Sequence, residues 1–153
     1  MNKYINSFKI TLPAKSANEA FSRSLISAFI AQLDPTIEEL CDIKTAVSEA
    51  VTNCIVHAYT NISDERKKII TPSSFIQDDG LVIVKIHDKG RGIEDIEKAL
   101  EPMYSGSGSE ERSGMGFSIM QCFTDKLIVK SKTGKGTTVT LKKYIGKHND
   151  IKN

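Results

Sequence analysis

The fold is decided by residues 48–59, which read SEAVTNCIVHAY. Within this stretch Glu49, Asn53 and His57 are spaced four residues apart, so on a helix they form one polar stripe. Apolar residues flank the stripe and would bury the rest of the helix. A polar stripe that borders a core is a place where a cleft can open. The spacing also fits a solvent-exposed face in which His57 caps the helix, and periodicity alone favours that interpretation.

Capping signals place the start of this helix and of an earlier one. Thr36 followed by Glu39 forms a capping box, in which each side chain bonds a free backbone amide at the other's position. We therefore expect a helix over residues 37–59. Ser16 followed by Glu19 predicts a second capping box, at the start of an amphipathic first helix.

Segments with strand character lie on both sides of these helices. Residues 4–12 alternate between apolar and polar side chains until Pro13, which indicates a half-buried strand. Pro72 cannot donate to a strand ladder, so we expect it to interrupt the next strand. The later strands are predicted over 69–77, 81–88, 126–132 and 137–143.

Because these later strands come as hairpin pairs, antiparallel pairing is favoured over a doubly wound parallel sheet. Further helices are predicted over residues 93–100 and 116–123. The predicted fold class is α+β, a two-layer sandwich with helices on one face of a mostly antiparallel, mixed sheet. Since 153 residues suffice for one core, we expect a single domain over residues 1–145 and a frayed polar tail over 146–153.

The second strand of the central pair ends in an acidic residue on its buried side. Val82, Val84 and Ile86 share one face by the two-residue period, and Asp88 points the same way. A buried carboxylate is costly unless it is hydrogen-bonded, so we expect Asp88 to accept hydrogen bonds from a specific partner. The alternative is a simple turn-forming role before Gly90.

Two pairs of glycines mark places where the backbone can approach a ligand closely. Gly90 and Gly92 lie in the turn after the central strand, although a single GxG is a weak signal. Gly114 and Gly116 open the last predicted helix, whose free amides and positive dipole end favour an anion. The second pair therefore predicts an anion site.

Composition and charge exclude several function classes. The net charge of +2 comes with lysines spread along the chain, so no nucleic-acid or membrane-surface patch is indicated. There is no signal-peptide pattern and no apolar run of membrane-spanning length, so we expect a cytoplasmic protein without direct nucleic-acid or membrane partners. Cys41, Cys54 and Cys122 fit no redox or metal spacing and are interpreted as reduced core residues.

In combination, these features are more specific than any one of them. Over roughly residues 36–141 the chain resembles the GHKL (Bergerat) ATP-binding family. The resemblance is carried, in order along the chain, by a helix with Glu49 and Asn53, the turn DKGRG, a polar loop, and GMG before a helix. Similarity to the anti-sigma-factor serine kinases is carried by SEAVTNCIVHAY, HDKGRGI, ERSGMGFSIM and KGTTVTLKK. The third of these stretches most resembles the sporulation anti-sigma F group.

The resemblance implies a role for each matching residue. Asn53 corresponds to the family's Mg²⁺ ligand, and Glu49 to the group that orients or deprotonates the attacking hydroxyl. Asp88 corresponds to the aspartate that reads the amino group of adenine, and Thr137 to the threonine that supports the adenine end. The other implied ATP-binding residues are Gly90, Gly92, Ser113, Gly114, Met115 and Gly116.

The resemblance also implies a lid over the nucleotide, formed by residues 103–113. Residues 105–114 lack large apolar side chains, so we expect a loop whose order depends on what it covers. Arg112 stands where these kinases place a guanidinium near the terminal phosphate, a catalytic role. The alternative is an exposed arginine paired with Glu110 or Glu111, which would contribute little energy.

The implied activity is that of an anti-sigma factor and ATP-dependent protein serine kinase. It would bind a sporulation sigma factor of the sigma F type and, with ATP and Mg²⁺, phosphorylate a serine of an anti-anti-sigma factor. Phe21 and Arg23 fall in a region that resembles the sigma-binding surface, and a homodimer is expected by family likeness. His57 is interpreted as structural, because histidine kinases carry their acceptor in a separate helical segment. Two alternatives stay open: a stress-response kinase of the sigma B branch, and a nucleotide-gated binding module without phosphotransfer.

Overall fold

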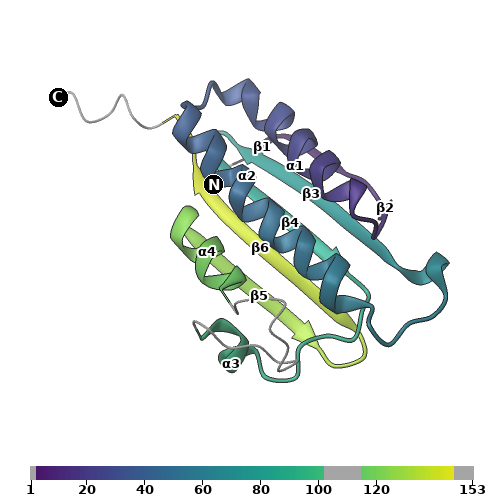
Figure 1. The fold of residues 1–153 in the computed structure, drawn as a ribbon. Helices are drawn as coiled ribbons and strands as arrows, with labels where there is room; N and C mark the ends of the chain where they lie inside the picture. Colours follow the sequence, from purple (N-terminus) through teal and green to yellow (C-terminus); the bar gives the residue numbers. More distant parts are fainter. Residues whose placement is uncertain (1–2, 102–114, 147–153) are drawn as a thin grey trace.

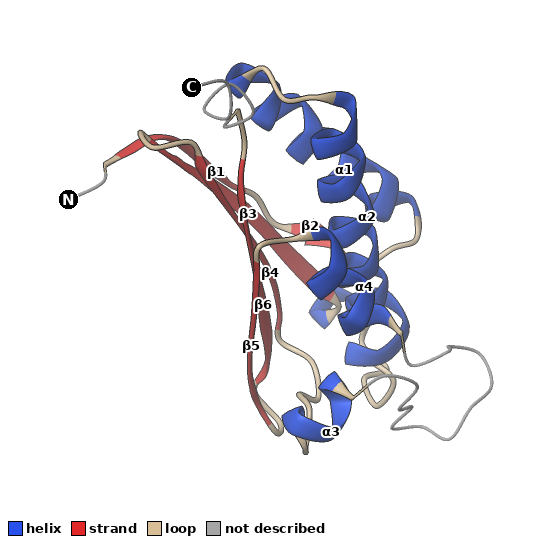
Figure 2. Ribbon diagram, turned by 90° about the vertical axis from the view of Figure 1, so that its left-hand side faces the viewer, coloured by secondary structure: helices blue, strands red, loops and turns tan. Residues whose placement is uncertain are grey.

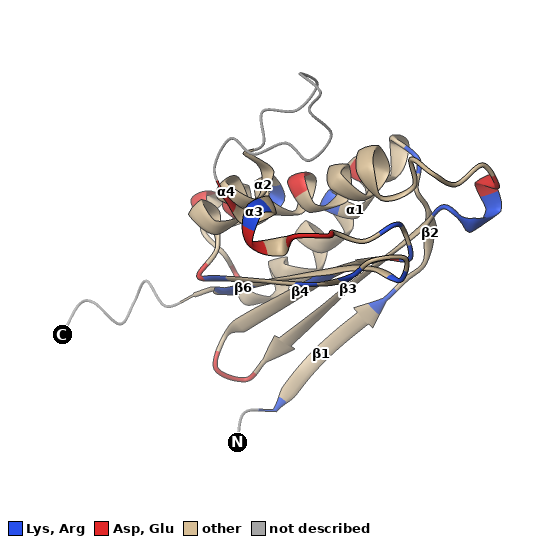
Figure 3. Ribbon diagram, turned by 90° about the horizontal axis from the view of Figure 1, so that it is seen from below, with Lys and Arg blue, Asp and Glu red and all other residues tan. Residues whose placement is uncertain are grey.

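The computed structural model describes residues 3–101 and 115–146. Six strands form one sheet, and the helices cover one of its faces (Figures 1 and 2). Seen from below, the helices again lie on one side of the sheet (Figure 3). Every strand pairing in the described part of the chain is antiparallel. The predicted two-layer α+β architecture is confirmed. The expected tail lies, from residue 147 on, outside the described residues.

The sheet runs in the order β1-β3-β4-β6-β5, with the short β2 also paired to β3. The strands are β1 (Tyr4–Lys9), β2 (Leu12–Pro13), β3 (Ile69–Gln77), β4 (Leu81–Asp88), β5 (Lys126–Lys132) and β6 (Gly136–Tyr144). The predicted bounds are confirmed for β3, β4 and β5, and β6 is one residue longer at each end. The first predicted strand is split into β1 and β2. Since β4 is central, Asp88 at its end is flanked by β3 and β6.

Pro72 does not interrupt β3, contrary to the prediction. It pairs with Ile86 of β4, and its carbonyl accepts a hydrogen bond from the Ile10 amide at 3.0 Å. In an extended residue the nitrogen and the carbonyl oxygen point to the same side, so the Pro72 nitrogen points away from β4. It faces the gap between β1 and β2, where the missing N–H removes no ladder bond from the centre of the sheet.

Helix α1 (Ala17–Ile30) and helix α2 (Ile37–Asn53) begin with different caps. At α2 the predicted capping box is confirmed, with Thr36 N to Glu39 Oε1 at 2.9 Å and Glu39 N to Thr36 Oγ1 at 3.1 Å. At α1 the prediction is wrong. Ser16 has helical dihedral angles and makes no side-chain cap, because a capping side chain reaches the amides from an extended conformation. Glu19 instead accepts a hydrogen bond from the Ser48 hydroxyl of α2.

The end of α2 carries an irregularity. The helix continues into a π-helical turn over Cys54–Ala58, so the helix predicted over residues 37–59 is confirmed in extent, with a wider last turn. Single π turns inside α-helices occur frequently at functional sites. The next helix, α3 (Ile96–Leu100), is shorter than predicted and is capped by Asp95. Helix α4 (Gly116–Phe123) has the predicted bounds.

The core lies between the helices and the sheet. Its fully buried side chains include Ile26, Ile30, Ile43, Val47, Val51, Ile70, Ile76, Val82, Val84, Ile86, Met120 and Leu141. Cys54 belongs to this core, but Cys41 and Cys122 are exposed, so their predicted burial is wrong. Both lie on outward-facing positions of their helices. None of the described helices is long and apolar enough to cross a membrane.

Candidate functional site

Asp88 is buried at the end of β4, with 5% of its surface exposed. Its Oδ1 accepts a hydrogen bond from the Gly90 amide at 2.9 Å, and its Oδ2 accepts one from the Cys54 thiol at 3.4 Å. The expected specific partners are therefore present. The turn-forming interpretation also holds in part, because the bond to Gly90 closes the turn that follows β4.

The loop after Asp88 is held against the end of the long helix. The Gly90 Cα lies so close to the π turn that an added Cβ would stand 2.2 Å from the Ala58 carbonyl oxygen. The Arg91 amide donates to that same oxygen at 2.8 Å. Gly92 has a φ of +76°, in the left-handed region that glycine adopts without strain. Gly90 and Gly92 thus let the loop pass between the helix end and the β5–β6 hairpin.

Tyr59, the residue that follows the π turn, holds the same loop in place. Its hydroxyl donates to the Ile69 carbonyl and accepts a hydrogen bond from the Lys89 amide at 2.8 Å. Burial raises the pKa of Tyr59 above its ordinary value, and the hydrogen bond from Lys89 opposes that rise. The phenol therefore keeps its proton at neutral pH and serves both as donor and as acceptor.

Thr137 lies beside Asp88. The two residues are directly paired between β4 and β6, so their side chains lie on the same face of the sheet. The Thr137 hydroxyl is 2.8 Å from the Ser131 hydroxyl, which also accepts from the Ile93 amide at 2.7 Å and lies 3.0 Å from the Gly136 carbonyl. This hydroxyl ties the loop after Asp88 to the β5–β6 hairpin.

The start of α4 lies against the polar stripe of α2. A Cβ added to Gly116 would stand 3.4 Å from both Asn53 Nδ2 and Glu49 Oε2, and 3.5 Å from Asn53 Oδ1. The side chain of Met115, the residue just before α4, makes no capping hydrogen bond. The first amides of a helix have no acceptor within it, so α4 begins with free donors close to the Glu49 and Asn53 side chains.

The structure therefore brings together two groups of the residues named from the sequence. Asp88, Gly90, Gly92 and Thr137 lie around the end of β4, and Glu49, Asn53, Met115 and Gly116 lie where α2 meets α4. Cys54 joins the groups, because it follows Asn53 directly and bonds Asp88. Arg112, Ser113 and Gly114, and the predicted lid over residues 103–113, lie outside the described residues. His57 lies half-buried in the π turn.

Sequence reasoning missed Cys54, Tyr59 and Ser131 as parts of this site. A signal for Cys54 was its position next to Asn53. A signal for Ser131 was its phase in the hairpin, because it shares the inward face with Leu127 and Val129 and pairs with Thr137. No local signal marks the Tyr59 hydroxyl, since its two partners come from β3 and from the loop after β4.

Phe21 and Arg23 lie apart from both groups, on α1. Phe21 is 50% exposed, and Arg23 pairs with Glu19 one turn earlier at 3.8 Å. Glu19 also bonds Ser48, the residue before Glu49. The surface of α1 is thus connected by side chains to α2.

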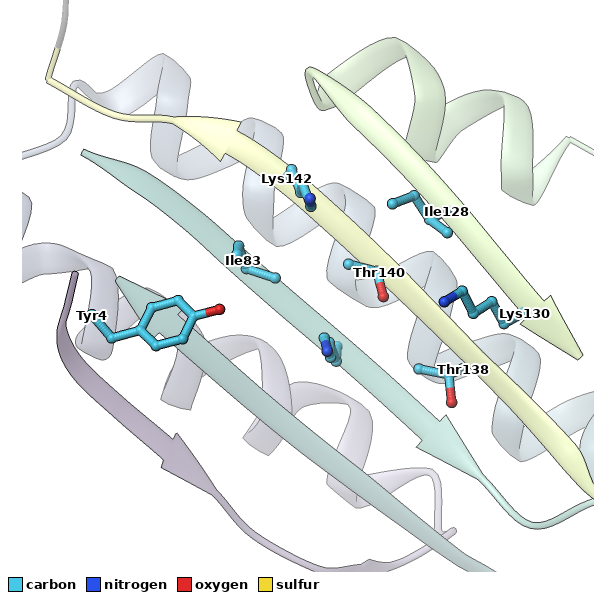
Figure 4. A pocket seen from close by; sticks show the side chains of 8 residues that line it. Tyr4, Ile83, Ile128, Lys130, Thr138, Thr140 and Lys142 are labelled. Carbon is cyan, nitrogen blue, oxygen red and sulfur yellow. The ribbon is translucent and has the colours of Figure 1, made fainter. Parts of the chain in front are cut away.

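A shallow cavity of about 350 Å³ lies on the opposite face of the sheet (Figure 4). It is lined by Tyr4, Ile83, Lys85, Ile128, Lys130, Thr138, Thr140 and Lys142. These strand residues alternate with the inward-facing ones, so the cavity opens away from the helices and from Asp88. It is separate from the site described above. The described residues contain no group of three or more His, Cys, Asp or Glu that could hold a metal ion by itself.

Comparison with known proteins identifies the chain's relatives. Residues 12–143 match the family described as the histidine kinase-like ATPase domain. An anti-sigma F factor of Caldanaerobacter subterraneus subsp. tengcongensis is 53% identical over 146 residues, which cover 95% of this chain and 99% of that protein. The chain belongs to the anti-sigma F factor family. Another member, from Geobacillus kaustophilus, is 49% identical over 142 residues, covering 93% of this chain and 94% of that protein.

Solved structures share the fold of this anti-sigma F family member at low identity. The RsbU and RsbW domains of a Mycobacterium tuberculosis protein match with a TM-score of 0.67 and 19% identity, covering 92% of this chain and 32% of that chain. The SiaB–SiaC complex of Pseudomonas aeruginosa matches with a TM-score of 0.63 and 12% identity, covering 91% and 89%. These likenesses show the fold. The ATPase domain that spans both residue groups implies ATP binding.

Proposed function

We propose that this anti-sigma F family member binds Mg-ATP between the end of β4 and the start of α4 and transfers the terminal phosphoryl group to a serine of a protein partner. The observation that carries the proposal is the meeting of a buried acid, a helix carboxamide and a helix N-terminus on the helix-covered face. Kinase chemistry of this kind needs positioning and charge stabilisation more than covalent catalysis.

The base of the nucleotide is proposed to lie against Asp88. Each carboxylate oxygen accepts one hydrogen bond from the protein, which leaves an acceptor direction on each for the amino group of adenine. Thr137 lies beside Asp88 and offers a hydroxyl to the same edge of the base. Gly90 and Gly92 keep side chains out of this end.

The phosphates are proposed to lie against the start of α4. The backbone amides of Met115 and Gly116, with those of Gly114 and Ser113, would bind phosphate oxygens at the positive end of the helix dipole. Asn53 and Glu49 supply oxygen ligands of the kind that Mg²⁺ prefers, and Asn53 is the proposed ligand. When bound, Mg²⁺ would neutralise charge on the transferring phosphoryl group.

The transfer itself is proposed to depend on Glu49 and Arg112. The Glu49 carboxylate lies 3.4 Å from the Cβ position of Gly116, so it faces the phosphate end and can orient the serine hydroxyl or accept its proton. Arg112 would bind the terminal phosphate through its planar donors. Its segment directly precedes α4 in the chain.

The partners are proposed from the family. Curated relatives that match over 90% or more of this chain carry the name anti-sigma F factor, which supports a sigma factor of the sigma F type as the inhibited partner. The phosphorylated partner is proposed to be an anti-anti-sigma factor. The exposed Phe21 and Arg23 on α1 are proposed sigma contacts, and the protein is proposed to act in the cytoplasm as a homodimer.

A phosphotransfer assay tests the proposal. The protein is incubated with γ-labelled ATP, Mg²⁺ and a candidate anti-anti-sigma protein, and the label is followed. Stable label on a partner serine is the expected result. ATP binding without any transfer would support a nucleotide-gated binding module instead. Transfer together with preference for a stress-response sigma factor over sigma F would support the sigma B alternative.

A further inference from the structure

Cys54 is the buried member of the three cysteines, with 3% of its surface exposed. It begins the π turn and follows Asn53 directly. Its sulfur lies 3.4 Å from Asp88 Oδ2, a hydrogen-bond distance for sulfur. An apolar side chain would fill this buried position equally well. Packing therefore does not explain why a thiol contacts the charged oxygen of Asp88.

Two donors from different elements hold the Asp88 carboxylate. The Gly90 amide, from the loop after β4, bonds Oδ1 at 2.9 Å, and the Cys54 thiol, from the helix layer, bonds Oδ2. Rotation of the carboxylate about its Cβ–Cγ bond would break both contacts. The amide alone would fix one oxygen and leave the plane of the carboxylate free to tilt.

The thiol acts as the donor in this pair. The Cys54 Sγ lies 3.4 Å from Asp88 Oδ2 and is placed as a donor to that oxygen. A protonated thiol beside a carboxylate can only donate usefully, because the carboxylate has no proton to give.

We propose that Cys54 is a positioning residue for base selection: its thiol holds the Asp88 carboxylate in the orientation that accepts a hydrogen bond from an exocyclic amino group. The inference rests on the proposed nucleotide site and assigns the selectivity for a 6-amino purine to the Cys54–Asp88 pair. The peptide between Asn53 and Cys54 then joins the phosphate end of the site to its base end.

Affinities for two nucleotides test this role. Calorimetry compares ATP with the triphosphate of purine riboside, whose base lacks the amino group, for the wild type, Cys54→Ala and Cys54→Ser. Cys54→Ala is expected to weaken ATP binding about threefold to tenfold and to leave binding of the analogue unchanged. Cys54→Ser keeps a donor and is expected to stay near the wild type. Cys41→Ala, on the exposed side of the same helix, is the matched control and should change neither affinity.

The results separate a positioning role from packing. Equal weakening of both nucleotides in Cys54→Ala, unchanged ATP affinity, or a serine variant that behaves like alanine would overturn the inference while leaving the proposed function intact. A wild type that fails to bind ATP would overturn both. If Cys54→Ala does not fold, Cys54→Val fills the volume without a donor and carries the same expectation.

Discussion

The base end and the phosphate end of the proposed site are built differently. At the base end, hydrogen bonds within the chain fix Asp88 and the loop that follows it, with donors from Cys54, Gly90 and Lys89. At the phosphate end, two helices lie against each other at Gly116, and its missing side chain leaves room beside Glu49 and Asn53. Base recognition is thus set by a preformed network, whereas phosphate binding depends on the spacing between α2 and α4.

The largest expected effect is on the rate of phosphotransfer at the phosphate end, where ATP binding should be little affected. Replacing Glu49 by glutamine is expected to lower the phosphotransfer rate about 10²- to 10⁴-fold, because the amide cannot accept the serine proton. Affinity for ATP should change little. Single-turnover transfer and calorimetry measure the two quantities separately. Glu38→Gln, on an exposed position at the far end of α2, is the control, and full transfer by Glu49→Gln would remove the proposed mechanism.

The second prediction tests whether the phosphate end of the site can be changed without affecting binding at the base end. Gly116→Val adds branched carbons to a Cβ that would already be in van der Waals contact with Asn53 and Glu49 at 3.4 Å, so the substitution fills the space beside these side chains. We expect ATP affinity to fall about tenfold, which corresponds to about 1.4 kcal/mol, because the added carbons occupy space at the proposed phosphate site. Adenosine, which lacks phosphates, should bind as it does to the wild type. An equal loss for adenosine would mean that the two ends are not independent.

The third prediction concerns the base end of the site and is measured as a change in the free energy of unfolding. A Cβ on residue 90 would stand 2.2 Å from the Ala58 carbonyl oxygen, so Gly90→Ala must push the loop away from the π turn. We expect a loss of about 2 kcal/mol in the free energy of unfolding, measured with urea. Gly134→Ala is the matched comparison, because nothing lies within 4 Å of its Cβ position and only the strain of its φ of +79° remains. A larger loss in Gly134→Ala would contradict the packing argument.

The smallest effect lies away from both ends. Thr36→Ala removes the capping box at the start of α2 and should lower stability by about 1 kcal/mol, while ATP affinity stays unchanged. Thr45→Ala, an exposed change on the same helix, should be nearly neutral. A loss of nucleotide affinity in Thr36→Ala would show that the whole of α2 responds to its cap.

Much of the fold follows from local signals in the sequence. The bounds of β3, β4 and β5 and of α4 were predictable because apolar periods and turn residues mark them. The prediction that Pro72 interrupts its strand was wrong, since the effect of a proline depends on which side of the strand its nitrogen faces. The predicted cap at Ser16 is also absent, because Ser16 is helical and Glu19 bonds Ser48, on a different helix. Both errors concern contacts between elements, which a local pattern does not contain.

The candidate site was predictable in its assigned residues but not in the network that supports them. Asp88 and the polar stripe of α2 stand out in the sequence because burial and spacing mark them. The hydrogen bonds of Cys54 and Ser131 do not, although their positions carry a signal, because each bond reaches a partner far away in the chain. Supporting hydrogen bonds of this kind emerge only when strands, hairpin and helix end are assembled.

The most direct test of the central claim is calorimetric titration of the wild type, Asp88→Asn and Asn53→Ala with ATP, each with and without Mg²⁺. We predict that the wild type binds ATP stoichiometrically and that this binding weakens when Mg²⁺ is omitted. Asp88→Asn should lose affinity for ATP whether or not Mg²⁺ is present. Asn53→Ala should bind ATP with an affinity that no longer depends on Mg²⁺. Absence of ATP binding by the wild type, or affinities indifferent to Mg²⁺ and to both substitutions, would contradict the central claim.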